Sequence, residues 1–172
     1  MWFRERREFW HEEVQPNGAV LGCRGMSYTR RSDGHWDANP QDNCLVIEED
    51  VFIGANATIH RGGWRRTHIH RGVRIGAQAN CGHNVVIEEN VLIAPQVSIA
   101  GSVTVGKGAV IWQGAVIRQH LTIGKGAVVG MGAVVTRDVP AGATVYGNPA
   151  RVSGLVPRDE SEVGEGDFPP GC

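Results

Sequence analysis

The sequence predicts an all-β chain wound into a parallel β-helix, and three observations support this fold class. Aliphatic residues, replaced once by Cys81, recur at every sixth position from residue 47 to residue 135, with one change of spacing. A second small or aliphatic residue precedes each of them by two positions. The position three after each is mostly glycine, asparagine or aspartate, which most readily adopt left-handed backbone angles. Each unit therefore reads as a short strand and a corner, and three units make one triangular coil.

The repeat falls into two runs. The first contains Ile47, Ile53 and Ile59, and the second continues in steps of six from Ile69 to Val135. A strict period of six does not keep one face of a helix with 3.6 residues per turn buried, so helices are excluded. A conventional sandwich of short strands would not need so regular a register. The step between the runs is ten residues, so four residues are inserted there.

The chain divides into four segments. Residues 1–15 are a charged N-terminal segment, and residues 16–44 form a hairpin or flap that leads into the helix. The helix itself spans residues 45–152 and carries an inserted loop at 60–66. We expect residues 153–172 to be a disordered acidic tail.

Composition narrows the function classes. The formal net charge of -1 gives no reason to expect nucleic acid as a partner. The four cysteines contain no C-x-x-C pair, so neither a zinc site nor a disulfide framework is predicted. The N-terminus is charged and no apolar run is long enough to span a membrane. We therefore expect a soluble cytoplasmic protein without a metal.

Unusual side chains collect on one edge of the predicted helix. Residues 18 apart stack on one another, so the corners that follow Ile59 and Cys81 share an edge with every third corner after them. His83 and His120, several arginines and the insertion all fall there. The two histidines are 37 residues apart, which is two coils plus one residue, or roughly 10 Å. This spacing suits one extended substrate lying along a groove. The segments on this edge are 60–66, 82–84, 100–102, 118–120 and 136–138.

These motifs resemble the UDP-3-O-acylglucosamine N-acyltransferases of lipid A biosynthesis, within the wider hexapeptide-repeat acyltransferases. The resemblance covers roughly residues 16–151 and implies a left-handed parallel β-helix of hexapeptide repeats. It also implies a homotrimer with active sites between subunits. The matching pieces are Gly25-Met26-Ser27-Tyr28 with Asp33-Gly34-His35-Trp36, "VIEEDVFIGANATIHRG" at 46–62, "CGHNVVI" at 81–87, "IAGSVTVG" at 99–106 and "RQHLTIG" at 118–124.

The resemblance implies that His83 is a general base, which takes a proton from an acceptor amine as the amine attacks a thioester. It gives His120 a role at the thioester end of the donor. From the shared edge we expect Asn84 to orient His83 and the backbone N–H of Gly101 to steady the oxyanion. The other residues expected to bind the donor are Ser102, Gln119, Arg137, Asn148 and Arg151. Those expected to bind the acceptor are Tyr28, His60, Arg61, Trp64 and Arg65.

Three features depart from the family's pattern. The lipid A enzymes hold uridine with a separate N-terminal domain, whereas few residues precede the match here, so we expect no such domain. The family's loop is acidic, whereas this one carries Arg61, Arg65 and Arg66, which suit a phosphate or carboxylate. The end at 134–152 resembles acetyl-coenzyme A sugar acetyltransferases, and no helical extension for acyl carrier protein is evident.

The expected function is therefore transfer of an acyl group from a thioester to an amino group of a sugar or sugar nucleotide. Coenzyme A and acyl carrier protein both remain open as the donor. One alternative is a metal enzyme like the γ-class carbonic anhydrases, for which His68-x-His70 is the nearest match, although their histidine pair five apart is missing. The other is a non-catalytic trimeric scaffold, in which His83 and His120 would be dispensable.

Overall fold

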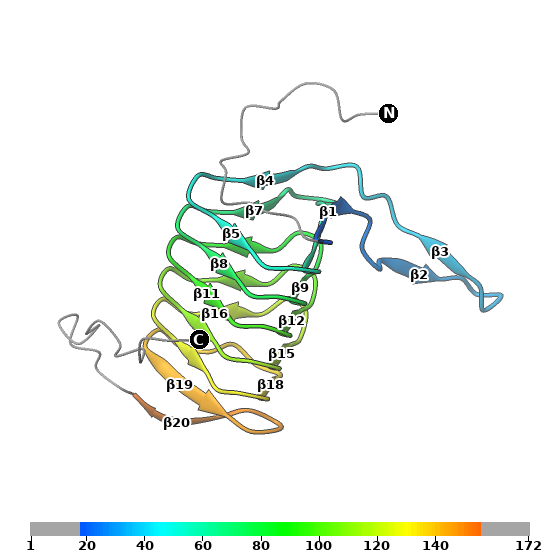
Figure 1. The fold of residues 1–172 in the computed structure, drawn as a ribbon. Coiled ribbons are helices and arrows are strands. Elements are labelled where there is room, and N and C mark those ends of the chain that lie inside the picture. The colour runs from blue at the N-terminus through cyan, green and yellow to red at the C-terminus, as the bar shows by residue number, and fades with distance from the viewer. Residues whose placement is uncertain (1–17, 156–172) are drawn as a thin grey trace.

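The computed structural model describes residues 18–155, and their regular secondary structure consists entirely of strands. The predicted segment 1–15 and residues 156–172 of the predicted tail lie outside this range. No helix among the described residues is long and apolar enough to cross a membrane. The strands wind into one solenoid from which a hairpin projects (Figure 1).

Three sheets form the faces of the solenoid. The first face contains, in order, β1 (Val20–Cys23), β6 (Thr58–His60), β9 (Asn80–Cys81), β12 (Ser98–Ile99), β15 (Val116–Ile117) and β18 (Val134–Val135). The second contains β4 (Leu45–Ile47), β7 (Thr67–Ile69), β10 (Val86–Ile87), β13 (Thr104–Val105) and β16 (Thr122–Ile123). The third contains β5 (Phe52–Ile53), β8 (Arg74–Ile75), β11 (Leu92–Ile93), β14 (Val110–Ile111), β17 (Val128–Val129), β19 (Ala143–Tyr146) and β20 (Arg151–Leu155).

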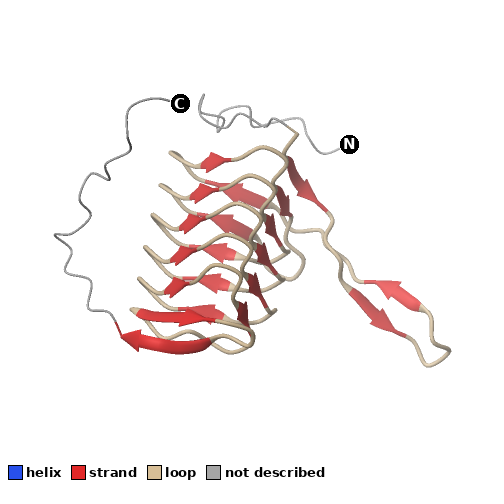
Figure 2. Cartoon of the chain, turned by 60° about the horizontal axis from the view of Figure 1, so that its bottom comes forward, coloured by secondary structure: helices blue, strands red, loops and turns tan. Residues whose placement is uncertain are grey.

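The strand register confirms the predicted stacking. Ile99 lies opposite Cys81 on one side and Ile117 on the other, which is a spacing of 18 residues. Ile47 lies opposite Ile69, a spacing of 22, so the four inserted residues sit between β6 and β7. Figure 2 shows the strands of successive coils stacked in columns.

The predicted corners have the backbone angles that the residue types suggest. Every one of them except Asp138 has a positive φ. Asp138 is different because the chain leaves the repeat there, and the following Val139 makes only an isolated bridge to Ile123. The corners with positive φ are Asp50, Asn56, Gly72, Gln78, Asn84, Asn90, Gln96, Ser102, Gly108, Gly114, His120, Gly126 and Gly132.

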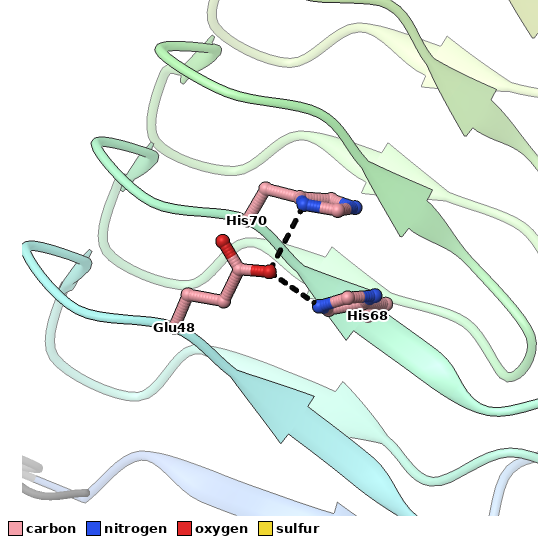
Figure 3. Close-up of side chains that lie close together, drawn as sticks. All are labelled: Glu48, His68 and His70. Atoms are coloured by element: carbon pink, nitrogen blue, oxygen red, sulfur yellow. Dashed lines mark hydrogen bonds and ion pairs between the residues drawn. The ribbon is translucent and has the colours of Figure 1, made fainter.

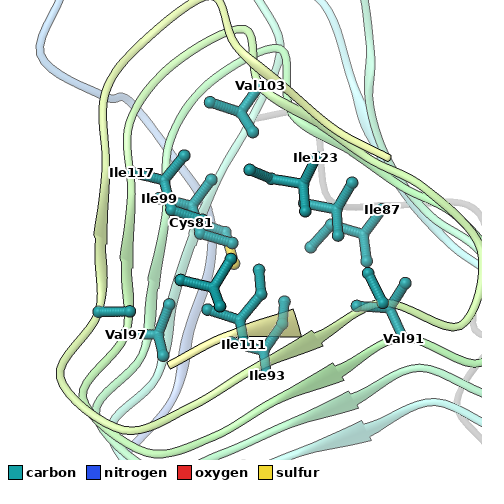
Figure 4. Close-up of a cluster of buried hydrophobic side chains, with 14 of the residues drawn as sticks. Cys81, Ile87, Val91, Ile93, Val97, Ile99, Val103, Ile111, Ile117 and Ile123 are labelled. Carbon is teal, nitrogen blue, oxygen red and sulfur yellow. The ribbon is translucent and has the colours of Figure 1, made fainter. Parts of the chain in front are cut away.

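The inward positions of the repeat form one continuous core (Figure 4). Ile59, Ile99 and Ile117 are completely buried, and such a side chain contributes about 1.5–3 kcal/mol by leaving water. Cys81 occupies the same column, and burial raises the pKa of its thiol to about 12. The predicted assignment of Cys81 to the core is confirmed.

Two segment boundaries differ from the prediction. Strand β1 pairs in parallel with β6, so the solenoid already begins inside the predicted flap segment 16–44. Strand β20 pairs with β19 in antiparallel fashion, so residues 153–155 are ordered in a sheet, and the predicted tail began too early. Both strands lack the six-residue pattern and are held by backbone hydrogen bonds. The hairpin of β2 (Tyr28–Arg30) and β3 (Trp36–Ala38) leads away from the stack (Figures 1 and 2).

Candidate functional site

The corners that follow the first face form an edge that we call the histidine edge, comprising residues 60–66, 82–84, 100–102, 118–120 and 136–138. Backbone hydrogen bonds hold its successive corners together. The N–H of Ser102 donates to the carbonyl of His83 (2.8 Å), and the N–H of His120 donates to that of Gly101 (3.1 Å). The predicted edge is therefore present, and it places the corners of His83, Gly101 and His120 in consecutive coils.

His83 is fixed by the corner residue that follows it. Nδ2 of Asn84 lies 2.8 Å from Nδ1 of His83, and Asn84 is only 2% exposed. The backbone N–H of Gly63 donates to Oδ1 of Asn84 (2.6 Å), which fixes the orientation of the amide. The amide nitrogen must then be the donor to His83. The neutral imidazole of His83 consequently carries its proton on Nε2.

The imidazole of His83 lies against the backbone of the next coil. A Cβ atom placed on Gly101 would be 2.7 Å from Nε2 of His83, which is closer than such atoms approach. Only glycine leaves the ring this space. The approach also brings the ring next to the backbone that the sequence predicts as the oxyanion donor.

The pKa values of two histidines on this edge are depressed. Burial lowers the pKa of His83, the charge of His120 lowers it further, and a hydrogen bond with the backbone of Met26 partly offsets both. Burial and then the charge of His83 lower the pKa of His60. Both imidazoles are therefore neutral near pH 7, which is the state in which a histidine accepts a proton.

Part of the predicted flap packs over these histidines. A Cβ atom on Gly25 would be 2.5 Å from Nδ1 of His60 and 3.2 Å from Cδ2 of His83. The N–H of Gly25 donates to Oε1 of Gln41 (2.6 Å), and Gln41 is 2% exposed. Among the described residues, Nε2 of Gln41 and Nδ1 of His60 are buried without a hydrogen-bond partner. These two polar atoms are available to a water molecule or a ligand.

The inserted loop supplies positive charge to the same edge. Nε of Arg65 donates to the carbonyl of Asn84 (2.8 Å), and its guanidinium carbon lies 5.0 Å from the centre of the Trp64 ring. Burial lowers the pKa of Arg65, which nevertheless stays charged at neutral pH. The N–H of Arg61 donates to the carbonyl of Cys23, which ties the loop to β1. The loop is thus anchored on both sides.

The remaining predicted residues are divided between this edge and other places. Ser102 is buried, with Oγ 3.4 Å from Nδ2 of Asn84. Gln119 and Arg137 are exposed on the histidine edge, one and two coils beyond Gly101. The predicted residues that the fold gathers on the edge are His60, Arg61, Trp64, Arg65, His83, Asn84, Gly101, Ser102, Gln119, His120 and Arg137.

Three predicted residues do not join this group within one chain. Tyr28 is half-exposed on the projecting hairpin. Asn148 and Arg151 are exposed in and beside the turn between β19 and β20. That turn hydrogen-bonds to Val134 of β18 as the next coil. It therefore lies four coils beyond the strand that precedes His83, which is roughly 19 Å along the axis.

Sequence reasoning missed the residues that support the site. Thr67 is fully buried, and its hydroxyl oxygen accepts the N–H of Asn84 (2.9 Å). The sequence feature that could have identified Thr67 is a polar residue at an inward position of the repeat. Gln41 and Gly25 lie outside the repeat, so no periodic pattern marks them. Among the described residues, the side chains grouped suitably for a metal are Glu48, His68 and His70, and they lie on the second face.

Comparison with known families agrees with the repeat. Residues 84–119 match the model of the bacterial transferase hexapeptide (six repeats), and residues 44–79 and 121–137 match that of the hexapeptide repeat of succinyl-transferase. The chain is a hexapeptide-repeat protein. The matches to these two family models confirm the six-residue repeat of this hexapeptide-repeat protein, independently of the strand geometry.

Its sequence is similar to curated acyltransferases over part of the chain. It is 44% identical over 69 residues to the UDP-3-O-acylglucosamine N-acyltransferase of Francisella tularensis subsp. holarctica. The aligned residues make up 40% of this chain and 20% of that relative. It is 40% identical over 73 residues to the enzyme of the same name from Syntrophobacter fumaroxidans, covering 42% and 21%. The matches thus span about a fifth of the length of these relatives, and the predicted resemblance is confirmed over that part.

Solved structures share the fold. A UDP-N-acetylglucosamine acyltransferase from Bacteroides fragilis 9343 superposes with a TM-score of 0.70 at 19% identity, over 80% of this chain and 52% of that chain. The Arabidopsis enzyme of the same name gives 0.69 at 27% identity, over 80% and 46%. The hexapeptide-repeat protein therefore has the left-handed parallel β-helix fold of these neighbours, as predicted.

Proposed function

We propose that this hexapeptide-repeat protein transfers an acyl group from a thioester to an amino group of a sugar or sugar nucleotide. The observation that carries the proposal is the setting of His83, an imidazole with a depressed pKa held between Asn84 and the backbone of Gly101. A base of this kind typically contributes about 10²–10⁴-fold to a rate. The N-acyltransferase names of the curated relatives support the same class.

In this mechanism the acceptor amine attacks the thioester carbonyl while His83 removes a proton from the nitrogen. The carbon–nitrogen bond forms, and the negative charge moves to the carbonyl oxygen, next to the backbone N–H of Gly101. The tetrahedral intermediate then collapses, the carbon–sulfur bond breaks, and the imidazolium returns the proton to the leaving sulfur. His120, which lies in the coil beyond Gly101, acts on the thioester end of the donor.

The position of the proton on His83 adds a requirement. In the described arrangement Asn84 donates to Nδ1, so Nε2 carries the proton and has no free lone pair. For Nε2 to act as the base, the ring proton must move to Nδ1, and the Asn84 amide must turn its oxygen toward the ring. That rotation breaks the hydrogen bond to Gly63. Substrate binding at the inserted loop and activation of His83 are therefore linked in this proposal.

The acceptor carries an anionic group that the loop recognises. The guanidinium of Arg65 is held by its hydrogen bond to the carbonyl of Asn84, and Arg61 supplies a second guanidinium whose Nε has no hydrogen-bond partner among the described residues. Guanidinium binds phosphate or carboxylate through paired hydrogen bonds. The exposed ring of Trp64 offers an apolar surface beside them. A sugar nucleotide satisfies both features. The donor is an acyl thioester on coenzyme A or on acyl carrier protein, and it reaches the edge past Gln119 and Arg137.

We also propose a homotrimer, as the resemblance implies. Large apolar side chains remain exposed on the third face and beside it, which is a reason for subunits to associate there. The projecting hairpin would then bring Tyr28 to a neighbouring subunit. The apolar side chains are Phe52, Leu92, Trp112, Val116 and Met131.

The test is release of free thiol from acetyl-coenzyme A and from long-chain acyl carrier protein, with a panel of amino sugars, free and UDP-linked. We expect one donor–acceptor pair to turn over, and His83→Ala to lower kcat/KM by at least about 10²-fold. His70→Gln is the matched control, because His70 follows Ile69 on the second face, outside the histidine edge and the hairpin. Turnover that survives His83→Ala would disprove the assigned base. Absence of turnover with every pair would favour the non-catalytic scaffold.

A further inference from the structure

Two histidines and a glutamate converge on the second face of the solenoid and are not part of the histidine edge (Figure 3). Oε1 of Glu48 lies 2.8 Å from Nε2 of His68 and 3.1 Å from Nδ1 of His70. Each of the three residues offers one ligand atom that lies within 4.8 Å of those of the other two. One carboxylate oxygen thus faces two ring nitrogens that belong to the neighbouring strand.

The register explains why these side chains meet. His68 and His70 flank the inward Ile69 of β7, so both point outward on the same side of the strand. Strand β4 pairs with β7 so that Ile47 lies opposite Ile69, which places Glu48 beside His70. The four-residue insertion sets this register. In the next coil Glu88 occupies the position beside His70, but its carboxylate accepts the N–H of Lys107 (2.8 Å).

The carboxylate of Glu48 is held in place by its other oxygen. The backbone N–H of Arg71 donates to Oε2 (3.0 Å), which leaves Oε1 directed at the two rings. Outer contacts of this type orient the ligands in metal sites. The side chains of His68, His70 and Glu48 are 23%, 28% and 34% exposed, so an ion and its water molecules can reach them.

The donor set selects a class of ion. Two imidazole nitrogens and one carboxylate oxygen suit zinc and its neighbours among the divalent transition metals, whereas magnesium and calcium prefer oxygen ligands. Ligand atoms around a tetrahedral zinc ion lie roughly 3.3 Å apart, so the oxygen–nitrogen distances need to open by only a few tenths of an ångström. The two rings are stacked, with centroids 3.9 Å apart and planes 27° apart. Binding requires them to rotate so that both lone pairs point at one ion.

We propose that Glu48, His68 and His70 form a binding site for one divalent transition-metal ion, with water in the remaining positions. His68 binds through Nε2 and His70 through Nδ1, and each neutral ring keeps its proton on its other nitrogen. The ion links β4 to β7 across the inserted loop and so fastens the first coil to the second. The site lies within one chain, and it is independent of the proposed acyl transfer.

The experiment is a titration of the metal-free full-length protein with Zn²⁺ by calorimetry, followed by visible absorption with Co²⁺. We expect one ion per chain and a rise in the melting temperature that a chelator reverses. Glu48→Gln and His68→Ala should each weaken binding at least ten-fold and abolish that rise. Glu88→Gln, the glutamate of the next coil, and His83→Ala should bind as the native chain does. Equal melting temperatures of the metal-free variants show that they are folded.

Two results would overturn the site. One is the absence of saturable Zn²⁺ binding by the native chain. The other is binding that survives His68→Ala but is lost in His83→Ala, because the ion would then lie among the histidines of the histidine edge. Neither result depends on acyltransferase activity, so failure of this site is distinguishable from failure of the proposed function.

Discussion

The imidazole of His83 rests on the backbone of Gly101, in the next coil, with so little space that a Cβ atom on Gly101 would be 2.7 Å from Nε2. The contact joins the proposed base to the proposed oxyanion donor across two coils. Because adjacent coils are held by a continuous ladder of backbone hydrogen bonds, the two groups keep a fixed separation. The geometry of the site therefore depends on the stacking of the solenoid.

Gly101→Ala should reduce activity with little loss of stability. The added methyl group displaces the His83 ring from its position, and we expect kcat/KM to fall at least ten-fold. The backbone can accept alanine, since Gly101 does not have a positive φ. Steady-state kinetics and thermal unfolding of the variant measure both effects. Ser98→Ala, an outward change in the strand just before Gly101, is the control. Unchanged kinetics in Gly101→Ala would contradict the proposed role of Nε2.

Two substitutions at Asn84 should have different effects on kcat/KM. Asn84→Asp puts an acceptor next to Nδ1, which favours a proton there and raises the pKa of His83. We expect kcat/KM to be retained, with its acidic limb moved to higher pH. Asn84→Gly keeps the corner, where φ is +61°, but removes the amide, so kcat/KM should fall at least ten-fold.

The control for the Asn84 variants is Asn90→Gly, at a corner with φ of +56° away from the histidine edge. Asn84→Gly also leaves the N–H of Gly63 without its acceptor, which costs about 1–3 kcal/mol of stability. The pH dependence of kcat/KM separates the two roles of Asn84. An acidic limb at the same pH in Asn84→Asp and the native chain would argue against the tautomer assigned to His83.

Stability should fall on mild acidification because of the same histidines. The folded chain holds the pKa of His60 and His83 below the ordinary value of 6.5, so the unfolded chain binds protons first as the pH drops. The free energy of unfolding then decreases as the pH falls below about 6.5. Urea unfolding at several pH values between 7.5 and 5 measures this. His60→Gln should flatten the dependence, and His35→Gln should leave it unchanged. Burial alone would raise the pKa of Glu48, but the backbone hydrogen bond from Arg71 and the nearby His70 and His68 outweigh it and lower that pKa, so the contribution of Glu48 is lost only below 4.5.

Gln41→Leu should loosen the flap segment over the site. The substitution leaves the partly buried N–H of Gly25 without its acceptor, which costs up to about 1–3 kcal/mol. We expect a lower melting temperature and a higher KM for the acceptor, with a smaller change in kcat. Lys107→Ala removes an exposed ion pair with Glu89, outside both the histidine edge and the hairpin, and is the control. A native KM in Gln41→Leu would show that the flap segment does not contribute to acceptor binding.

The six-residue period was sufficient to predict most of the fold. It predicts the inward side chains, the corners and the stacking of Ile59 on Cys81, because a strand alternates its side chains and each coil repeats the last. It also predicts that His83 and His120 share an edge. The strands β1 and β20 were not predicted, because they pair through backbone groups without the periodic side chains.

The details of the site depend on contacts that no pattern marks. Gln41 reaches Gly25 from a loop outside the repeat, and the direction of the Asn84 amide depends on Gly63. Glu48 meets His70 only because the insertion sets that register. The resemblance matches residues along the chain but does not show which of them meet within one subunit. It therefore grouped Asn148 and Tyr28 with the site, whereas the structure places both outside the histidine edge.

The antiparallel pairing of β20 with β19 also affects how the molecule behaves at high concentration. A parallel solenoid can in principle be extended by another copy, because its last coil presents unpaired backbone groups in the same direction as every coil before it. Strand β20 runs against that direction and occupies the edge of the third face. It therefore acts as a terminal cap that opposes end-to-end polymerisation into fibres.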